Sequence, residues 1–175
     1  VAKGKYIWFF DSDDVLKSNS LSDLKSIITE NDFDRIRVGM FVFSGDASHY
    51  INDKELKTNS NATDSNVCSS LLSRAFICEH NCRFNTDLAY SEDGVFIFET
   101  NIHLPTIFVV DKPLYLYRIR ENSAMTSFDV AANKKKIKSH FIVVKTMKEY
   151  YENNVGNSVA SANQMMASTW YILNS

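Results

Sequence analysis

Three carboxylates lie in four consecutive positions near the start of this 175-residue chain, at Asp11, Asp13 and Asp14, with Ser12 between the first two. Like charges so close together raise each other's pKa unless a cation neutralises them. The five residues before them, Tyr6 to Phe10, are large β-formers and predict a strand buried on both faces. Open α/β sheets bind ligands at the carboxyl ends of their strands, and oxygen ligands suit Mg²⁺ or Mn²⁺. We therefore predict a divalent-metal site at this cluster of carboxylates, the alternative being an acidic turn.

A second acidic pair, Glu92 and Asp93, opens a predicted helix over residues 92–102. Adjacent carboxylates can divide their roles, one acting as a general base while its neighbour fixes the geometry. The simpler interpretation is that acids suit the positive end of the helix dipole. Both interpretations stay open on these residues alone.

Two arginines, Arg118 and Arg120, occupy alternate positions at the end of a predicted strand. Alternate residues of a strand point to the same side, so the two guanidinium groups can clamp a phosphate or a diphosphate. The alternative is a pair of ordinary surface arginines.

The elements that must position these residues follow from the apolar periodicity. A strand at 6–10, a helix at 21–30 capped by Ser18 or Ser20, and a strand at 35–44 form a βαβ unit and predict an α/β sheet. Downstream we expect a polar excursion at 45–66 with a short strand near 49–51, a short helix at 67–76, the helix at 92–102, and strands at 106–110 and 114–119 separated by a turn at 111–113 and followed by a loop at 120–128.

The tail is predicted to be helical. Ile137, Phe141, Val144 and Tyr151 form one stripe, which we expect to pack against the protein, and the lysines lie elsewhere on the helix. A break at 153–157 precedes a further helix at 158–173. A solvated lysine face is the simpler interpretation of the charges, and a weak electrostatic contact with anionic lipid is the alternative.

Composition narrows the class of protein. The apolar fraction of 45% and the charged fraction of 23% are ordinary for a globular chain. A net charge of −2 argues against broad nucleic-acid binding, which needs a basic surface. Cys78 and Cys82 near His80 are interpreted as ordinary thiols in a reducing compartment rather than as a zinc site.

In order and spacing, three stretches resemble the GT-A glycosyltransferases of family 2, particularly the bacterial enzymes of surface-polysaccharide synthesis. They run from Ala2 through the Asp-Ser-Asp-Asp turn, from Arg83 through Glu92, Asp93 and Phe96, and from Leu114 through Arg118 and Arg120 to Ser123. The resemblance covers roughly residues 2–127. It implies a partial GT-A, Rossmann-like mixed sheet flanked by helices over residues 1–128, with a helical extension over 129–175.

The resemblance also implies roles. Asp11 and Asp13 would hold Mn²⁺ or Mg²⁺ with a nucleotide-sugar, which we expect to be a UDP-sugar, and Ser12 belongs to this donor-binding turn. Asp14 would contact the donor sugar, and Arg118 and Arg120 would face the diphosphate. Asp93 would be the general base, and Glu92 would orient the site. The reaction would be an inverting displacement onto a saccharide or lipid-linked acceptor, at the cytoplasmic face of a bacterial inner membrane.

Nothing in the chain corresponds to the strand, loop and acidic stretch that bind the nucleotide base in that family. The chain is therefore expected to be a C-terminal portion of the domain, with little activity by itself. Two alternatives stay open. A haloacid-dehalogenase-like phosphatase would use Asp11 as nucleophile and Asp13 as acid, and a non-catalytic α/β module would use the acids only in turns.

Overall fold

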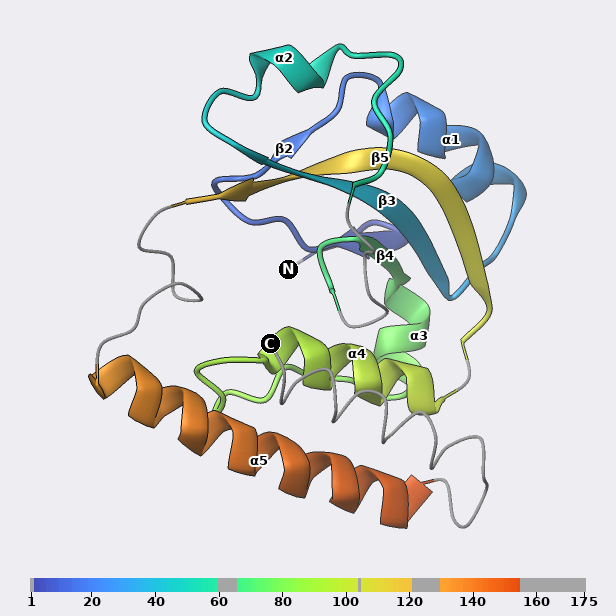
Figure 1. Ribbon diagram of the computed structural model, residues 1–175. Helices are drawn as coiled ribbons and strands as arrows, with labels where there is room; N and C mark the ends of the chain where they lie inside the picture. Colours follow the sequence, from blue (N-terminus) through green and yellow to red (C-terminus); the bar gives the residue numbers. More distant parts are fainter. Residues whose placement is uncertain (1, 60–65, 104, 121–129, 155–175) are drawn as a thin grey trace. The chain divides into compact units, whose positions relative to one another are not determined.

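The computed structural model describes residues 2–59, 66–103, 105–120 and 130–154 (Figure 1). The chain forms two compact units. The first, here called the sheet unit, comprises Val1–Thr63, Cys68–Phe76 and Pro105–Ser123, and the second, the helical unit, comprises Asp64–Val67, Ile77–Leu104 and Ala124–Ser175. The predicted division at residue 128 stays a prediction, because compactness alone does not delimit a catalytic domain.

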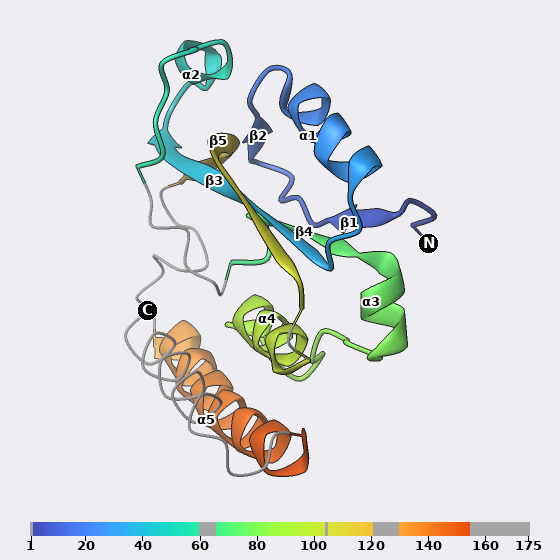
Figure 2. The same ribbon diagram turned by 90° about the vertical axis from the view of Figure 1, so that its right-hand side faces the viewer.

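The sheet unit contains a five-stranded mixed sheet in the order β1-β4-β3-β5-β2. Its strands are β1 (Tyr6–Trp8), β2 (Val15–Leu16), β3 (Arg35–Ser44), β4 (Ser70–Ser73) and β5 (Ile107–Ile119). The long strands β3 and β5 run parallel and side by side in both views (Figures 1 and 2), and the other pairs are antiparallel. Since β4 is antiparallel to both β1 and β3, the strands β1, β3 and β5 share one direction. The predicted α/β class with a mixed sheet flanked by helices is confirmed.

The prediction of a first strand buried on both faces is wrong. β1 ends at Trp8, its three residues are half-buried, and Phe10 is 45% exposed. The reason is that β1 pairs only with β4 and lies at one edge of the sheet within the described residues. The aromatic residues of the predicted strand still contact neighbouring segments. Trp8 Nε1 donates to the Cys68 carbonyl at 2.6 Å, and Phe10, beyond the end of β1, packs edge-on against Tyr115.

The predicted helix after the acidic turn is confirmed as α1 (Ser20–Glu30), but its predicted cap is wrong. Asn19 precedes it with a φ of 66°, and no side chain caps its N-terminus. Ser20 Oγ instead donates to the carbonyls of Lys17 and Leu114, at 2.7 and 3.0 Å. The hydroxyl therefore ties the start of α1 to β5.

Two short elements were predicted wrongly. Residues 49–51 are not a strand but part of α2 (Ser48–Ile51), where the Asp46 carboxylate accepts from Ser48 N and Oγ at 3.0 and 2.6 Å and so starts the helical turn. Residues 67–76 are not one helix: they contain β4 and the beginning of α3 (Arg74–Glu79). Pairing with β1 and β3 on both sides holds β4 extended, and such tertiary pairing overrides a local helical pattern.

The predicted turn at 111–113 is also wrong, because β5 is one continuous strand through Pro113. The ladder with β3 shifts register on both sides of Gly39, which pairs with Pro113. A proline lacks the N–H of a regular ladder and is tolerated at such a bulge. Gly39 is required there, since a Cβ would lie 2.5 Å from the Lys112 carbonyl oxygen.

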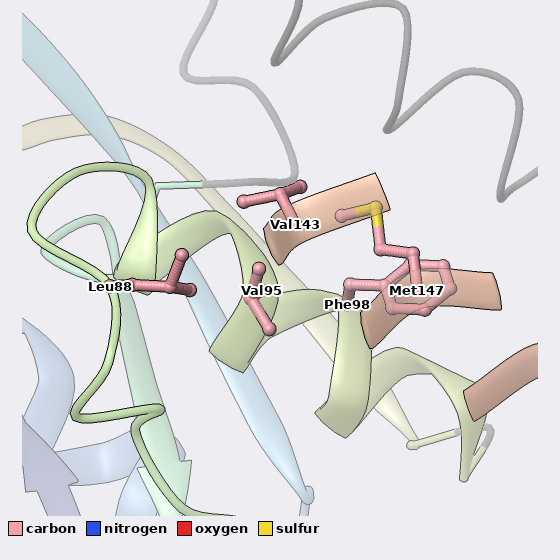
Figure 3. Close-up of a cluster of buried hydrophobic side chains, with 5 residues drawn as sticks. All are labelled: Leu88, Val95, Phe98, Val143 and Met147. Carbon is pink, nitrogen blue, oxygen red and sulfur yellow. The ribbon is translucent and has the colours of Figure 1, made fainter. Parts of the chain in front are cut away.

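The helical unit is built on α4 (Glu92–Ile102) and α5 (Val130–Asn154). Leu88, Val95 and Phe98 pack against two residues of α5, Val143 and Met147 (Figure 3). No described helix is long and apolar enough to cross a membrane.

The predicted helix in the tail is confirmed as α5, but its predicted packing stripe is wrong. Phe141 is 74% exposed and Ile137 56% exposed, whereas Ser139, Val143 and Met147 are buried. The face with Val143 and Met147 meets α4, and that contact decides which stripe is inside. The side chain of Tyr151, the loop from residue 121 to 128 and the predicted helix at 158–173 lie outside the described residues.

We predict that replacing two adjacent valines of α5 has very different effects on the free energy of unfolding. Val143→Ala should lower the free energy of unfolding by about 1–3 kcal/mol, because the side chain is fully buried. Val144→Ala should change it by less than about 0.5 kcal/mol, because Val144 is 41% exposed. Chemical denaturation measures both, and equal losses would contradict the assigned face of α5.

Candidate functional site

The carboxyl ends of the parallel strands meet at one edge of the sheet unit. The acidic turn (residues 11–14) follows β1, Gly45 follows β3, and Arg118 and Arg120 lie at the end of β5. Arg118 joins these ends, because its Nε donates to the Asp13 carbonyl at 2.8 Å and its Nη1 donates to the Gly45 carbonyl. The structure therefore brings the predicted donor-binding residues together, at the sheet edge where open α/β sheets bind ligands.

Asp14 is the buried member of the acidic turn, with only 7% of its surface exposed. Its Oδ1 accepts from the backbone N–H of Arg118 at 2.7 Å, and its Oδ2 accepts from the hydroxyl of Tyr115. Burial raises the pKa of this carboxyl, although both hydrogen bonds oppose the shift. Both oxygens of Asp14 are thus held by β5. Its predicted contact with the donor sugar stays a prediction.

Tyr115 is fully buried and was not among the residues predicted from the sequence. Its hydroxyl donates to Asp14 and accepts from the backbone N–H of Asp11 at 3.4 Å. Burial, together with the Asp14 hydrogen bond, raises the pKa of Tyr115, so the hydroxyl stays a neutral donor. The sequence did contain a signal for this role, because Tyr115 lies between Leu114 and Leu116. A tyrosine inside an apolar strand needs a hydrogen-bond partner for its hydroxyl.

The two arginines hold the acidic turn in different ways. The Arg118 guanidinium lies over the Phe43 ring at 4.7 Å in addition to its two carbonyl contacts. Arg120 Nε lies 2.6 Å from Asp13 Oδ2, and its side chain is 59% exposed. The Arg118 side chain is therefore fixed by contacts within the protein, whereas the exposed Arg120 side chain can change its position. Their contact with a diphosphate stays a prediction.

Asp11 and Asp13 remain the candidate metal ligands. Asp11 is exposed like Ser12, with the Cys68 thiol 3.7 Å from its Oδ2, and Asp13 is half-buried. Among the described residues, no group of three or more histidine, cysteine or acidic side chains could hold a metal by itself. Mg²⁺ usually takes one or two carboxylates plus substrate phosphates. The two carboxylates therefore fit part of a site that a diphosphate would complete.

Glu92 and Asp93 lie in the helical unit, at the predicted start of α4. Ser91 precedes them with a φ of 62°, and Asp93 Oδ1 accepts from the Gly94 N–H at 2.7 Å. Both acids are half-buried. The confirmed helix start fits the dipole interpretation and leaves the catalytic one a prediction.

The cysteine region of the helical unit also has a defined geometry. His80 stacks on His103 with ring centroids 4.1 Å apart. Cys82 is buried, and burial raises the pKa of its thiol to about 11, whereas Cys78 is exposed. Cys82 is therefore a neutral thiol near pH 7.

A pocket of about 740 Å³ lies elsewhere on the sheet unit, beside the start of α1 and the middle of β5. Its lining includes Lys17, Lys54, Lys57 and Lys112 and none of the acidic turn. The candidate site is therefore an edge of the sheet and is distinct from this pocket.

The raised pKa of Asp14 makes a prediction about pH. The folded carboxyl keeps its proton to a higher pH than the unfolded one, so the wild-type free energy of unfolding falls as pH rises through the folded pKa. Asp14→Asn does not titrate there. Its stability relative to wild type should therefore improve from about pH 4 to pH 7, as measured by urea denaturation across that range. The exposed Ser12→Ala is the control and should keep the wild-type pH profile. A constant difference between Asp14→Asn and wild type would contradict the assignment.

Comparison with known proteins gives the fold a reference. No family model and no curated protein matches the chain. Solved structures do: S. aureus TarS 1-349 is 18% identical with a TM-score of 0.64, covering 98% of this chain and 47% of that one. The same protein in complex with UDP gives 17% identity and a TM-score of 0.62, covering 97% and 47%. The complex of that protein with UDP-GlcNAc is 16% identical with a TM-score of 0.57, covering 99% of this chain and 58% of that one.

The chain thus spans about half the length of the TarS structures it matches. TarS is a GT-A glycosyltransferase of family 2, and the likeness confirms the predicted resemblance at the level of the fold. The chain has the fold of part of a GT-A domain.

Proposed function

We propose that this chain is part of a glycosyltransferase that uses a nucleotide-sugar donor. The observation that carries the proposal is the acidic turn, held by Tyr115 and Arg118 at the carboxyl edge of a partial GT-A sheet. The structures with the same fold support it, since two of them are complexes of TarS with UDP and with UDP-GlcNAc. A UDP-sugar is the donor we propose.

Within this proposal the acidic turn binds the diphosphate end of the donor. Asp13 and Asp11 would hold Mn²⁺ or Mg²⁺, which would supply positive charge beside the departing nucleoside diphosphate. Arg120 is exposed beside Asp13 and can reach a phosphate oxygen once it leaves that carboxylate. Asp14 keeps the turn in place through β5.

The acceptor side is proposed to use the acidic pair of α4. Asp93 takes the proton of the acceptor hydroxyl as that oxygen attacks the anomeric carbon, and Glu92 orients the site. The bond from the anomeric carbon to the diphosphate breaks as the new glycosidic bond forms, so the configuration inverts. The proposed acceptor is a saccharide or a lipid-linked saccharide of surface-polysaccharide synthesis, and the proposed location is the cytoplasmic face of the inner membrane.

The two alternative interpretations, a phosphatase and a non-catalytic module, predict different ligands and products. A phosphatase with Asp11 as nucleophile would form an aspartyl-phosphate there and would hydrolyse phosphomonoesters. A non-catalytic module would bind neither a nucleotide nor a phosphomonoester. The binding experiment below separates all three.

We predict that UDP binds the full-length product of the gene that encodes this chain in the presence of Mn²⁺, and that Asp13→Asn weakens this binding at least about tenfold, because it removes a charged ligand of the cation. Isothermal titration of UDP, with Mn²⁺ and with EDTA, measures both effects. Asp32→Asn is the matched control, since its side chain is 90% exposed in the same unit and should leave UDP binding unchanged.

Equal UDP affinity with EDTA and in Asp13→Asn would remove the metal assignment. Absence of UDP binding with hydrolysis of a phosphomonoester would favour the phosphatase. Absence of both would favour the non-catalytic module.

For the acceptor side we predict that Asp93→Asn lowers sugar transfer by about 10²–10⁴-fold, the contribution of a general base, while UDP binding is retained. The chain spans only half of its structural relatives, and we expect little transfer from it alone. Transfer is therefore measured in the full-length product of its gene. Asp87→Asn, an exposed acid of the same unit, is the control. Full transfer by Asp93→Asn would exclude Asp93 as the base.

A further inference from the structure

α5 carries an apolar stripe that is exposed and takes no part in the core of the helical unit. It is named here the outer stripe and consists of Val130, Ile137, Phe141 and Val144, which are 72%, 56%, 74% and 41% exposed. At 3.6 residues per turn these positions fall within roughly 60° of one another around the helix axis. They therefore lie along one side of the helix rather than scattered around it.

A different face of α5 holds the helix in place. Val143 and Met147 are buried against Val95 and Phe98 of α4 (Figure 3). The outer stripe is thus free to contact something else without loss of this core. Contiguous exposed apolar surface of this kind marks an interaction site more often than chance exposure.

The charge around the stripe indicates what it contacts. Residues 130–148 contain six lysines and neither aspartate nor glutamate, in a chain whose net charge is −2. Lys134, Lys138 and Lys145 are exposed and lie on the turns that carry the stripe. Ion pairs at 3.7 Å, Lys145 with Glu149 and Lys148 with Glu152, neutralise only the C-terminal end among the described residues. The N-terminal half of the stripe is therefore strongly basic.

We propose that α5 docks in the plane of an anionic lipid bilayer, with the outer stripe at the boundary of headgroups and acyl chains and the lysines on headgroup phosphates. A basic helix with one apolar face and no spanning length is suited to this position. Four apolar side chains are too few to hold a helix on a membrane alone, so the lysines supply the rest of the attraction. The proposal does not depend on the glycosyltransferase assignment, since it uses only residues of α5 and none of the acidic turn.

The test is co-sedimentation of the chain with vesicles of phosphatidylcholine alone and of phosphatidylcholine mixed with phosphatidylglycerol. We expect at least tenfold more binding to the anionic vesicles and loss of most of it in 0.5 M NaCl, because salt screens exposed charges. Lys134→Glu with Lys138→Glu should abolish binding. Lys54→Glu with Lys57→Glu makes the same charge change on the sheet unit and should not.

A second matched pair of variants tests the apolar contribution to vesicle binding. Phe141→Ser should weaken binding to anionic vesicles several-fold, whereas Leu21→Ser, which alters a 66% exposed side chain of α1, should leave it unchanged. Circular dichroism and thermal melting confirm that each variant is folded, as expected for changes at exposed positions.

Three outcomes would overturn the proposal. The first is equal binding to neutral and anionic vesicles, and the second is an equal loss in the Lys54 and Lys57 control. The third is absence of vesicle binding together with self-association that Phe141→Ser removes, which would assign the outer stripe to a second copy of the chain.

Discussion

The two hydrogen bonds that Asp14 accepts from β5, here called the clamp, are the interaction on which the candidate site depends. A buried carboxylate is costly unless its oxygens are hydrogen-bonded, and here the Tyr115 hydroxyl and the Arg118 N–H meet that requirement. The contact fixes the turn that begins after β1 onto a strand about a hundred residues further along the chain. Asp11 and Asp13 owe their place at the sheet edge to it, because Asp14 is their anchor.

The clamp in turn requires the irregular register of β3 and β5. From Val38 to Met40 the ladder advances two residues on β3, while β5 advances five, from Val110 to Tyr115. A regular ladder would have set Tyr115, rather than Arg118, opposite Phe43. Gly39 permits the shift because it has no side chain to meet the Lys112 carbonyl. One glycine in the middle of the sheet thus decides which residues of β5 reach the acidic turn.

In the helical unit, α5 has two apolar faces with different environments. The α5 face with Val143 and Met147 forms the core with α4, and the face with Ile137 and Phe141 stays outside among lysines. The amphipathic pattern of this helix is therefore weak, because it has apolar residues on two sides. Such a sequence predicts a helix well but leaves open which of the two faces is buried.

The sequence by itself determined the elements whose pattern is local: β3, α1, α4 and α5 from periodicity, and an acidic turn directly after a strand. Only the tertiary structure decided the extended state of β4, the continuity of β5 and the partners of Asp14. The physical reason is that these features depend on hydrogen bonds between distant segments, as between Tyr115 and Asp14, 101 residues apart. Short-range propensity carries no information on a partner that only the folded sheet brings within reach.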